Sequence, residues 1–234
     1  HGRIPGGALA VIGYGRLGGG ALTHASDLDL VFLFSGAHSA ESDGARPLGA
    51  THYYNRLAQR VSAALSVPTA EGALYEVDTR LRPSGDQGPL AVSFDSFARY
   101  QQEQAWTWEH MALCRARVVY GSPVARAELV RIVSRALLSP RDPDKLRAEV
   151  LEMRATMANH KPPKGPLDVK LARGGLVDLE FLIHYRQLRD GAGIPGALTP
   201  FLGNALQRFG EAGLLPSLAS GESAQAPAAF PMAF

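Results

Sequence analysis

Two aspartates, Asp27 and Asp29, stand at the mouth of an apolar run that continues over residues 30–34. On a β-strand, residues i and i+2 face the same side, so the two carboxylates can hold cations together. A carboxylate at the start of a buried strand is costly unless it is paired or bound to a metal, which favours a metal site over a simple polar turn. Asp78, in the alternating segment "ALYEVDTRLRP", is the candidate third carboxylate on a neighbouring strand.

A glycine-rich segment, "VIGYGRLGGG" at residues 11–20, precedes these acids and contains the pattern G-x-G-x-x-G. A dinucleotide-binding fold would need a crossover helix of about ten or more residues and then an acid about 20 residues further on. Only eight residues separate Gly18 from Asp27. The spacing therefore argues against a dehydrogenase and favours a metal–nucleoside triphosphate, with backbone N–H groups on the phosphates and the acids on magnesium.

Two arginines, Arg80 and Arg82, follow Asp78 at positions i+2 and i+4 of the alternating segment. On a strand they share a face with Asp78, where they can meet phosphate oxygens. The alternative for either arginine is a solvated charged face, and the sequence leaves both interpretations open.

Two tryptophans, Trp106 and Trp108, could border a nucleotide or a protein substrate. Trp108 continues a helical stripe begun by Phe97 and Tyr100, and this spacing favours packing in the core. The one cysteine, Cys114, lies in the apolar setting "HMALCRARVV" and is expected to be a buried thiol without an activating partner.

Lys170 and Arg173 stand just before Gly174-Gly175 and a helix start, a suitable geometry for an anion. Asp178 and Glu180, in the first turn of that helix, could instead only complement its dipole, and both interpretations remain open.

The elements that must position these residues follow from hydrophobic periodicity and turn signals. Strands are expected at residues 9–12 and 28–34, a helix at 51–66, and a hairpin of strands 74–82 and 90–92. Ser93 should cap the next helix. After residue 120 only helices are expected, at 123–138, 144–159, 176–189 and from 199 onward.

This change of pattern predicts an α+β protein with a catalytic domain at residues 1–120 and an all-α helical domain at 121–215. Residues 216–234 are rich in small residues and proline without a period, and are expected to form a disordered tail.

The composition, with 46% hydrophobic and 20% charged residues, is that of a globular protein, and the net charge of +2 offers no field for nucleic acid or membrane partners. A single cysteine excludes an internal disulfide and multi-cysteine metal sites. No apolar run reaches the length of about 18 residues needed to cross a bilayer, and no export signal opens the chain, so a cytoplasmic protein is expected. Because the chain starts at His1 and enters a motif almost at once, we expect it to be a piece of a longer protein.

The segments "GYGRLGGGALTHASDLDLVF", "RLAQR", "LYEVDTRLRPSG", "EQAWTWEHMALCRARVVYG" and "RGGLVDLEF" resemble a known family. The first is similar to the signature of the polymerase beta-like nucleotidyltransferase superfamily, a glycine turn followed by D-x-D and a third acid on a later strand. Together, over about residues 8–215, they resemble the glutamine synthetase adenylyltransferases, bifunctional enzymes with an adenylyl-transferring and an adenylyl-removing half. This resemblance implies a mixed sheet with flanking helices followed by an all-α domain.

The resemblance also implies a site for ATP and two Mg²⁺ ions, with Asp27, Asp29 and Asp78 as metal ligands and catalytic residues. The nucleotide-binding residues that it implies are Gly15, Arg16, Gly18, Gly19, Ser26, Arg80 and Arg82.

The implied function is transfer of AMP from ATP to a tyrosine of glutamine synthetase, with release of pyrophosphate, in nitrogen metabolism. The segments around Asp78 and Trp106 are more similar to the C-terminal, adenylylating half. Phosphorolytic removal of AMP by the homologous other half, and a non-catalytic regulatory module of the same fold, are the alternatives. The nitrogen-signalling protein PII is expected to act through the full-length enzyme, and the family continues in helices where this chain has its small-residue tail.

Overall fold

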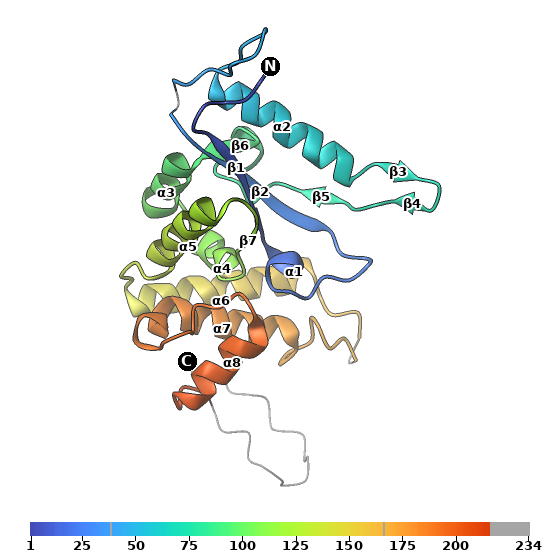
Figure 1. The fold of residues 1–234 in the computed structure, drawn as a ribbon. Coiled ribbons are helices and arrows are strands. Elements are labelled where there is room, and N and C mark those ends of the chain that lie inside the picture. The colour runs from blue at the N-terminus through green and yellow to red at the C-terminus, as the bar shows by residue number, and fades with distance from the viewer. Residues whose placement is uncertain (38, 166, 216–234) are drawn as a thin grey trace. The chain divides into compact units, whose positions relative to one another are not determined.

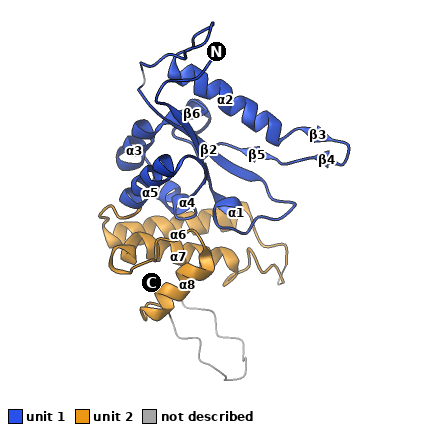
Figure 2. Ribbon diagram, viewed as in Figure 1, with its two compact units in different colours: residues 1–136 blue, residues 137–234 orange. Residues whose placement is uncertain are grey.

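The chain divides into two compact units, residues 1–136 and 137–234 (Figure 2). The computed structural model describes residues 1–37, 39–165 and 167–215, so the predicted tail lies outside the described residues. Helix α5 (Pro123–Leu137), which the sequence analysis assigned to the helical domain, falls in the first unit except for its last residue. Within the described part of the chain, no helix is both long and apolar enough to cross a bilayer.

The first unit is built on a mixed sheet whose central strand is β2 (Leu28–Ser35). Strand β1 (Ala8–Gly13) pairs with β2 antiparallel and, at its other edge, with β7 (Arg117–Tyr120). The second edge of β2 is shared by two short parallel partners, β5 (Val77–Asp78) and β6 (Ala91–Ser93) (Figure 1). The continuous apolar run of β2 is explained by this central place, because it is covered on both edges and on its faces.

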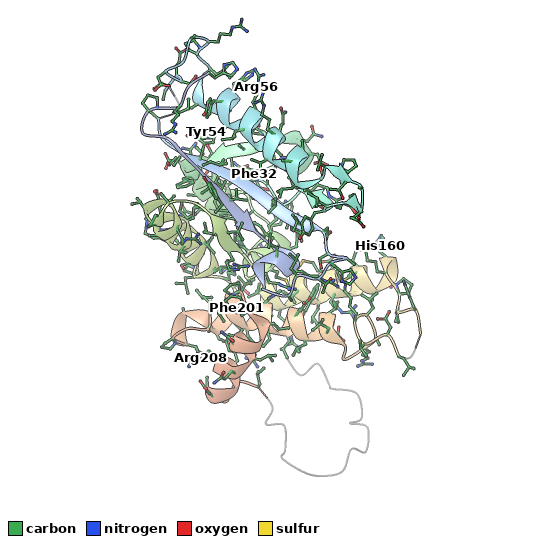
Figure 3. The ribbon with its side chains drawn as sticks, turned by 45° about the vertical axis from the view of Figure 1, so that its right-hand side comes forward. Phe32, Tyr54, Arg56, His160, Phe201 and Arg208 are labelled. Carbon is green, nitrogen blue, oxygen red and sulfur yellow. The ribbon has the colours of Figure 1, made fainter. Side chains whose placement is uncertain are left out.

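Helix α2 (Ala50–Leu65) covers one face of this sheet with the side chains of Tyr54 and Ala58. The rings of Tyr54 and Phe34 stack with centroids 4.6 Å apart, and Phe32 belongs to the same apolar cluster. Figure 3 shows Phe32 and Tyr54 between helix and sheet, whereas Arg56 is exposed on the helix. The apolar positions at helical spacing therefore fold as the sequence predicts.

The remaining elements of the first unit are short. They are α1 (Gly15–Gly18), the two-stranded hairpin of β3 (Pro68–Thr69) and β4 (Gly72–Ala73), the 3-10 turn η1 (Gly85–Gln87), α3 (Phe94–Glu103) and α4 (Thr107–Leu113). The side chain of Ser93 accepts a hydrogen bond from the N–H of Ser96, so the predicted cap of α3 is confirmed.

Two predictions about this unit are wrong. Residues 74–82 and 90–92 do not form a hairpin, because only β5 is a strand there and β6 pairs with β2 instead. The intervening chain winds around the guanidinium of Arg82, which donates to the carbonyls of Thr79 (2.9 Å) and Gly88 (3.3 Å) and so replaces strand pairing. Strand β7 was not expected, because its four residues follow a helix without a strand-like alternation.

The second unit contains only helices among its described residues, as predicted. These are α6 (Pro143–His160), α7 (Leu176–Asp190), the turn η2 (Gly191–Gly193) and α8 (Leu202–Glu211). Asp142 caps α6 by accepting hydrogen bonds from the N–H groups of Asp144 and Lys145. Helices α7 and α8 bury Ile183, Ala205 and Phe209 together, each at most 1% exposed.

Candidate active site

The pairing of β2 and β5 brings the predicted carboxylates together at one end of the sheet. Asp29 and Asp78 are direct partners in this parallel pair, so their side chains lie on the same face of adjacent strands. Asp27 precedes Asp29 by two residues and is exposed. Three acids that lie up to 51 positions apart in the chain are thus gathered at one end of the strands β2 and β5.

The charges of Asp27 and Asp78 act on the ionisation of Asp29. Partial burial, and then the charges of Asp27 and Asp78, raise the pKa of Asp29 from 3.8 to about 6, against the lowering effect of Arg115 and Arg80. A carboxylate that ionises this reluctantly marks a site where a cation is favoured.

The glycine turn packs directly on Asp29. Gly15 has φ of +52°, in the left-handed region, and a Cβ at this position would overlap the Oδ2 of Asp29. The N–H of Tyr14 donates to the carbonyl of Asp29 at 2.9 Å, which fixes the turn to the strand. Glycine is required at position 15 because any side chain there would displace the carboxylate.

The rest of the turn offers fewer free donors than the sequence indicated. The N–H groups of Gly18 and Gly19 donate to the carbonyls of Tyr14 (2.7 Å) and Gly15 (3.1 Å). The N–H groups that the turn itself leaves without an acceptor are those of residues 15–17, which open α1. Gly18 and Gly19 therefore shape the turn, and contact of either residue with a nucleotide stays a prediction.

Arg16 and Ser26 are joined to each other. The Nη1 of Arg16 donates to the Oγ of Ser26 at 3.2 Å, and the N–H of Thr23 donates to the same oxygen at 3.0 Å. Ser26 is buried. This contact fixes the loop that leads into Asp27.

Arg80 and Arg82 have different environments. Arg80 donates from Nε to both oxygens of Asp78, at 3.0 and 2.9 Å, and its Nη2 donates to the Oδ2. This pairing holds the pKa of Asp78 below its ordinary value. Arg82 is only 8% exposed and serves the loop described above, with Asp86 as its ion-pair partner at 3.4 Å. Binding of phosphate by Arg82 stays a prediction, and its Nε and Nη1 already donate within the loop.

The carboxylates of Asp27, Asp29 and Asp78 are the type of ligand that a hard divalent cation such as Mg²⁺ prefers. As the side chains stand, no three His, Cys, Asp or Glu residues of the described ranges are arranged to hold a metal ion. Asp78 is the member that is engaged elsewhere, because its two oxygens accept from Arg80. The three carboxylates thus offer the donor type that Mg²⁺ prefers, and a metal ion at this site stays a prediction.

Two arginines that the sequence analysis did not select hold the glycine turn from β7 and the residues before it. Arg117 donates to the carbonyls of Gly18 (3.0 Å) and Leu17 (2.7 Å). Arg115 lies against Gly19, where an added Cβ would be 2.8 Å from its Nη2, and its charge acts on Asp29. The spacing "RAR" is visible in the sequence, but its distance of about 100 residues from the turn gave no signal of contact.

The prediction that both tryptophans pack in the core is wrong. Trp106, which precedes α4, is 71% exposed, and Trp108 in α4 is 46% exposed. Glu109 of the same helix is buried. Glu109 accepts hydrogen bonds from the N–H of Trp106 (2.9 Å) and the hydroxyl of Tyr100 (2.8 Å). This start of a new helix breaks the predicted stripe and turns the indoles outward. Cys114 is buried, as predicted.

At the start of α7, in the second unit, backbone N–H groups are hydrogen-bonded to the preceding loop. The N–H groups of Leu176 and Val177 donate to the carbonyls of Val169 (2.9 Å) and Lys170 (3.1 Å). Asp178 accepts from the N–H of Gly174 at 2.6 Å and pairs with Arg154. The N–H groups of Leu176 and Val177 are thus used within the chain, whereas Lys170 and Arg173 are exposed, and binding of an anion by these two side chains stays a prediction.

This chain is similar to one known protein family and to several known proteins. The family model described as "Glutamate-ammonia ligase adenylyltransferase" matches residues 2–132. A protein of Rhizobium meliloti (strain 1021) is 50% identical over 189 residues, which are 80% of this chain and 19% of that protein. One of Xanthomonas campestris pv. campestris (strain B100) is 46% identical over 213 residues, 88% of this chain and 23% of that protein.

Both of these relatives, and one of Bradyrhizobium sp. (strain BTAi1 / ATCC BAA-1182) that is 45% identical over 217 residues, are named bifunctional glutamine synthetase adenylyltransferase/adenylyl-removing enzyme. The chain spans about a fifth of the length of the curated relatives that it matches.

Proposed function

The chain belongs to the glutamate-ammonia ligase adenylyltransferase family, and from this we propose that it transfers AMP from ATP to a tyrosine hydroxyl of glutamine synthetase. The observation that carries the proposal is the pairing of Asp29 with Asp78 across two adjacent parallel strands, beside Asp27 and a glycine turn. Neighbouring carboxylates are the ligands that the metal ions of a triphosphate would need, and this supports the proposal.

In the proposed reaction the phenolic oxygen of the tyrosine forms a bond to the α-phosphorus of ATP, while the bond to the pyrophosphate leaving group breaks in line. Asp27 and Asp29 would hold two Mg²⁺ ions, one of which would also carry the triphosphate, and Asp78 would help to hold the second ion and to deprotonate the phenol. The ordinary tyrosine pKa is about 10, and bound Mg²⁺ supplies the charge that makes the phenolate accessible near neutral pH. The protein residues thus align the groups and balance the developing charge.

The phosphates are proposed to lie over the glycine turn. Because the N–H groups of Gly18 and Gly19 are used within the turn, side-chain cations must carry a larger part of the phosphate charge. Arg80, which is exposed at the end of β5, and Arg16 of the turn are the proposed contributors. The nucleotidyltransferase fold of the polymerase beta type is part of this proposal, and the observed mixed sheet agrees with it in kind.

The direction of the reaction is proposed to be transfer, because the segments around Asp78 and Trp106 resemble the C-terminal half of the family. Removal of AMP, in which inorganic phosphate attacks the adenylylated tyrosine and ADP leaves, would use the same three acids. Glutamine synthetase as the protein substrate, PII as a partner of the full-length enzyme, and a cytoplasmic location belong to the same proposal.

The test is incubation of the protein with glutamine synthetase, Mg²⁺ and ATP labelled in the α-phosphate. Label on glutamine synthetase supports transfer, whereas phosphate-dependent release of ADP from adenylylated glutamine synthetase supports removal. Binding of ATP without either reaction would favour a regulatory module.

The acids are tested in the same assay by Asp27→Asn with Asp29→Asn, compared with Asp95→Asn, an exposed acid on α3. Unchanged Mg²⁺-dependent transfer in the double variant would contradict the site.

A further inference from the structure

We propose that Arg80 is an exchangeable counter-ion, which occupies the carboxylate of Asp78 in the metal-free protein and leaves it for the phosphates when a metal–triphosphate binds. This inference rests on the proposed function and extends it, because it assigns two alternating partners to one side chain. It also accounts for the contacts that occupy both carboxylate oxygens of Asp78 in the metal-free protein.

The contact between Arg80 and Asp78 uses the atoms that a metal would need. The guanidinium approaches both carboxylate oxygens, through Nε at 3.0 and 2.9 Å and through Nη2. A bidentate pair of this kind leaves little room for a cation on the same side of the carboxylate. Asp78 is therefore shielded from a free divalent ion while Arg80 is in place.

The pair is also built so that only one partner has to move. The side chain of Arg80 is 73% exposed, whereas that of Asp78 is 17% exposed. A second bond, from the backbone N–H of Arg80 to the Oδ1 of Asp78 at 2.8 Å, does not involve the guanidinium. The carboxylate therefore keeps its orientation at the end of β5 when the guanidinium swings away through solvent.

Arg82, the other arginine that follows Asp78, is held in a different way from Arg80. It is buried and donates to carbonyl and hydroxyl oxygens of its own loop, at 2.9 and 3.0 Å to Thr79 and 3.3 Å to Gly88. Removing it from these partners would leave buried acceptors unsatisfied, which is costly. Of the two arginines that follow Asp78, only Arg80 can change partners at low cost.

The exchange couples metal entry to nucleotide entry. A metal ion alone must displace Arg80 from Asp78 without offering the guanidinium a new anion. A metal–triphosphate supplies both the cation for Asp78 and phosphate oxygens for Arg80. The site consequently takes up the metal together with its nucleotide in preference to the metal alone.

The experiment measures binding of Mn²⁺, by electron paramagnetic resonance, and of Mn²⁺–ATP, by calorimetry, to the whole chain. Arg80→Ala should bind Mn²⁺ alone about two- to fivefold more tightly, the range that an exposed ion pair is worth, and should bind Mn²⁺–ATP more weakly than the wild type. Arg80→Lys, which keeps the charge but not the bidentate contact, should give a smaller change of both kinds. Arg60→Ala, at an exposed arginine on α2, is the matched control and should change neither.

Opposite signs for the two ligands exclude a purely structural role, which would weaken both, and a smaller change in Arg80→Lys separates loss of the bidentate contact from loss of the charge alone. If Arg80→Ala binds Mn²⁺ no more tightly while the wild type still binds Mn²⁺–ATP, the exchange is refuted and the proposed function stands. If the wild type binds Mn²⁺ but does not bind ATP with it, both are refuted.

Discussion

Replacing Asp29 with asparagine should stabilise the metal-free protein near neutral pH, although it removes a proposed metal ligand. The physical reason is that Asp29 is partly buried and stands beside Asp27 and Asp78, so its ionised form is disfavoured in the folded state. Asparagine has nearly the same shape and carries no charge. The substitution therefore removes a repulsion that folding has to overcome.

The magnitude follows from the pKa of Asp29, which folding raises from 3.8 to about 6. At about 1.4 kcal/mol per pH unit, this corresponds to an upper bound of about 3 kcal/mol. Solvent screening of a half-exposed carboxylate reduces the expected gain to about 1–2 kcal/mol.

Because folding raises the pKa of Asp29, the effect of this residue on stability changes with pH in a definite direction. A raised pKa means that the folded state holds the proton more tightly, so the stabilisation is complete below about pH 4 and is lost as the pH rises through about 6. The gain from asparagine should thus be small at low pH and complete above the pKa of the folded protein.

The assay is urea unfolding in the presence of a chelator, at about pH 4.5 and about pH 8. Asp78→Asn is the control, for which the opposite change in stability is expected. Arg80 lowers the pKa of Asp78, so the negative charge of Asp78 stabilises the fold above that pKa. Asp78→Asn should therefore give no gain at the higher pH. A loss of stability in Asp29→Asn at pH 8, or a gain of equal size at both pH values, would refute the reasoning.

Three further predictions can be checked by urea unfolding of purified variants. Gly18→Ala should cost about 2–3 kcal/mol, because its Cβ would overlap the backbone carbonyl of Arg115, which cannot rotate away; a loss below 1 kcal/mol would contradict this contact. Arg154→Ala should cost about 2 kcal/mol, because it leaves Asp178, 19% exposed, without its ion-pair partner; lysine at position 154 should restore part of the loss. Trp106→Ala should change stability by less than about 0.5 kcal/mol, because the indole is 71% exposed, and a large loss would show that it packs after all.

Local spacing was sufficient for the features that depend on neighbouring residues. Asp27 and Asp29 share a face because alternate residues on an extended chain always do. The five apolar residues after Asp29 could form only a buried strand, and β2 is the centre of the sheet. The helices of the second unit likewise follow from apolar periodicity and from a cap such as Asp142.

Predictions failed where the hydrogen bonds of a buried polar side chain overrode the apolar pattern. The alternation after Leu74 indicated a long strand, but Arg82 turns the chain by binding the carbonyls of Thr79 and Gly88. The stripe that placed Trp108 in the core was broken by Glu109, whose carboxylate starts a separate helix. Neither effect can be read from spacing, because each depends on which group a buried polar side chain reaches.

The amino-acid sequence by itself determined the family, the glycine turn and the two acids of the D-x-D motif, because these are encoded by residues close together in the chain. Only the tertiary structure decided that Asp78 pairs with Asp29, that Arg80 occupies it, and that Arg115 lies against the turn. These contacts join segments that are distant in sequence or depend on side-chain direction. They are decided by strand register and by the competition of each cation for a carboxylate or a carbonyl.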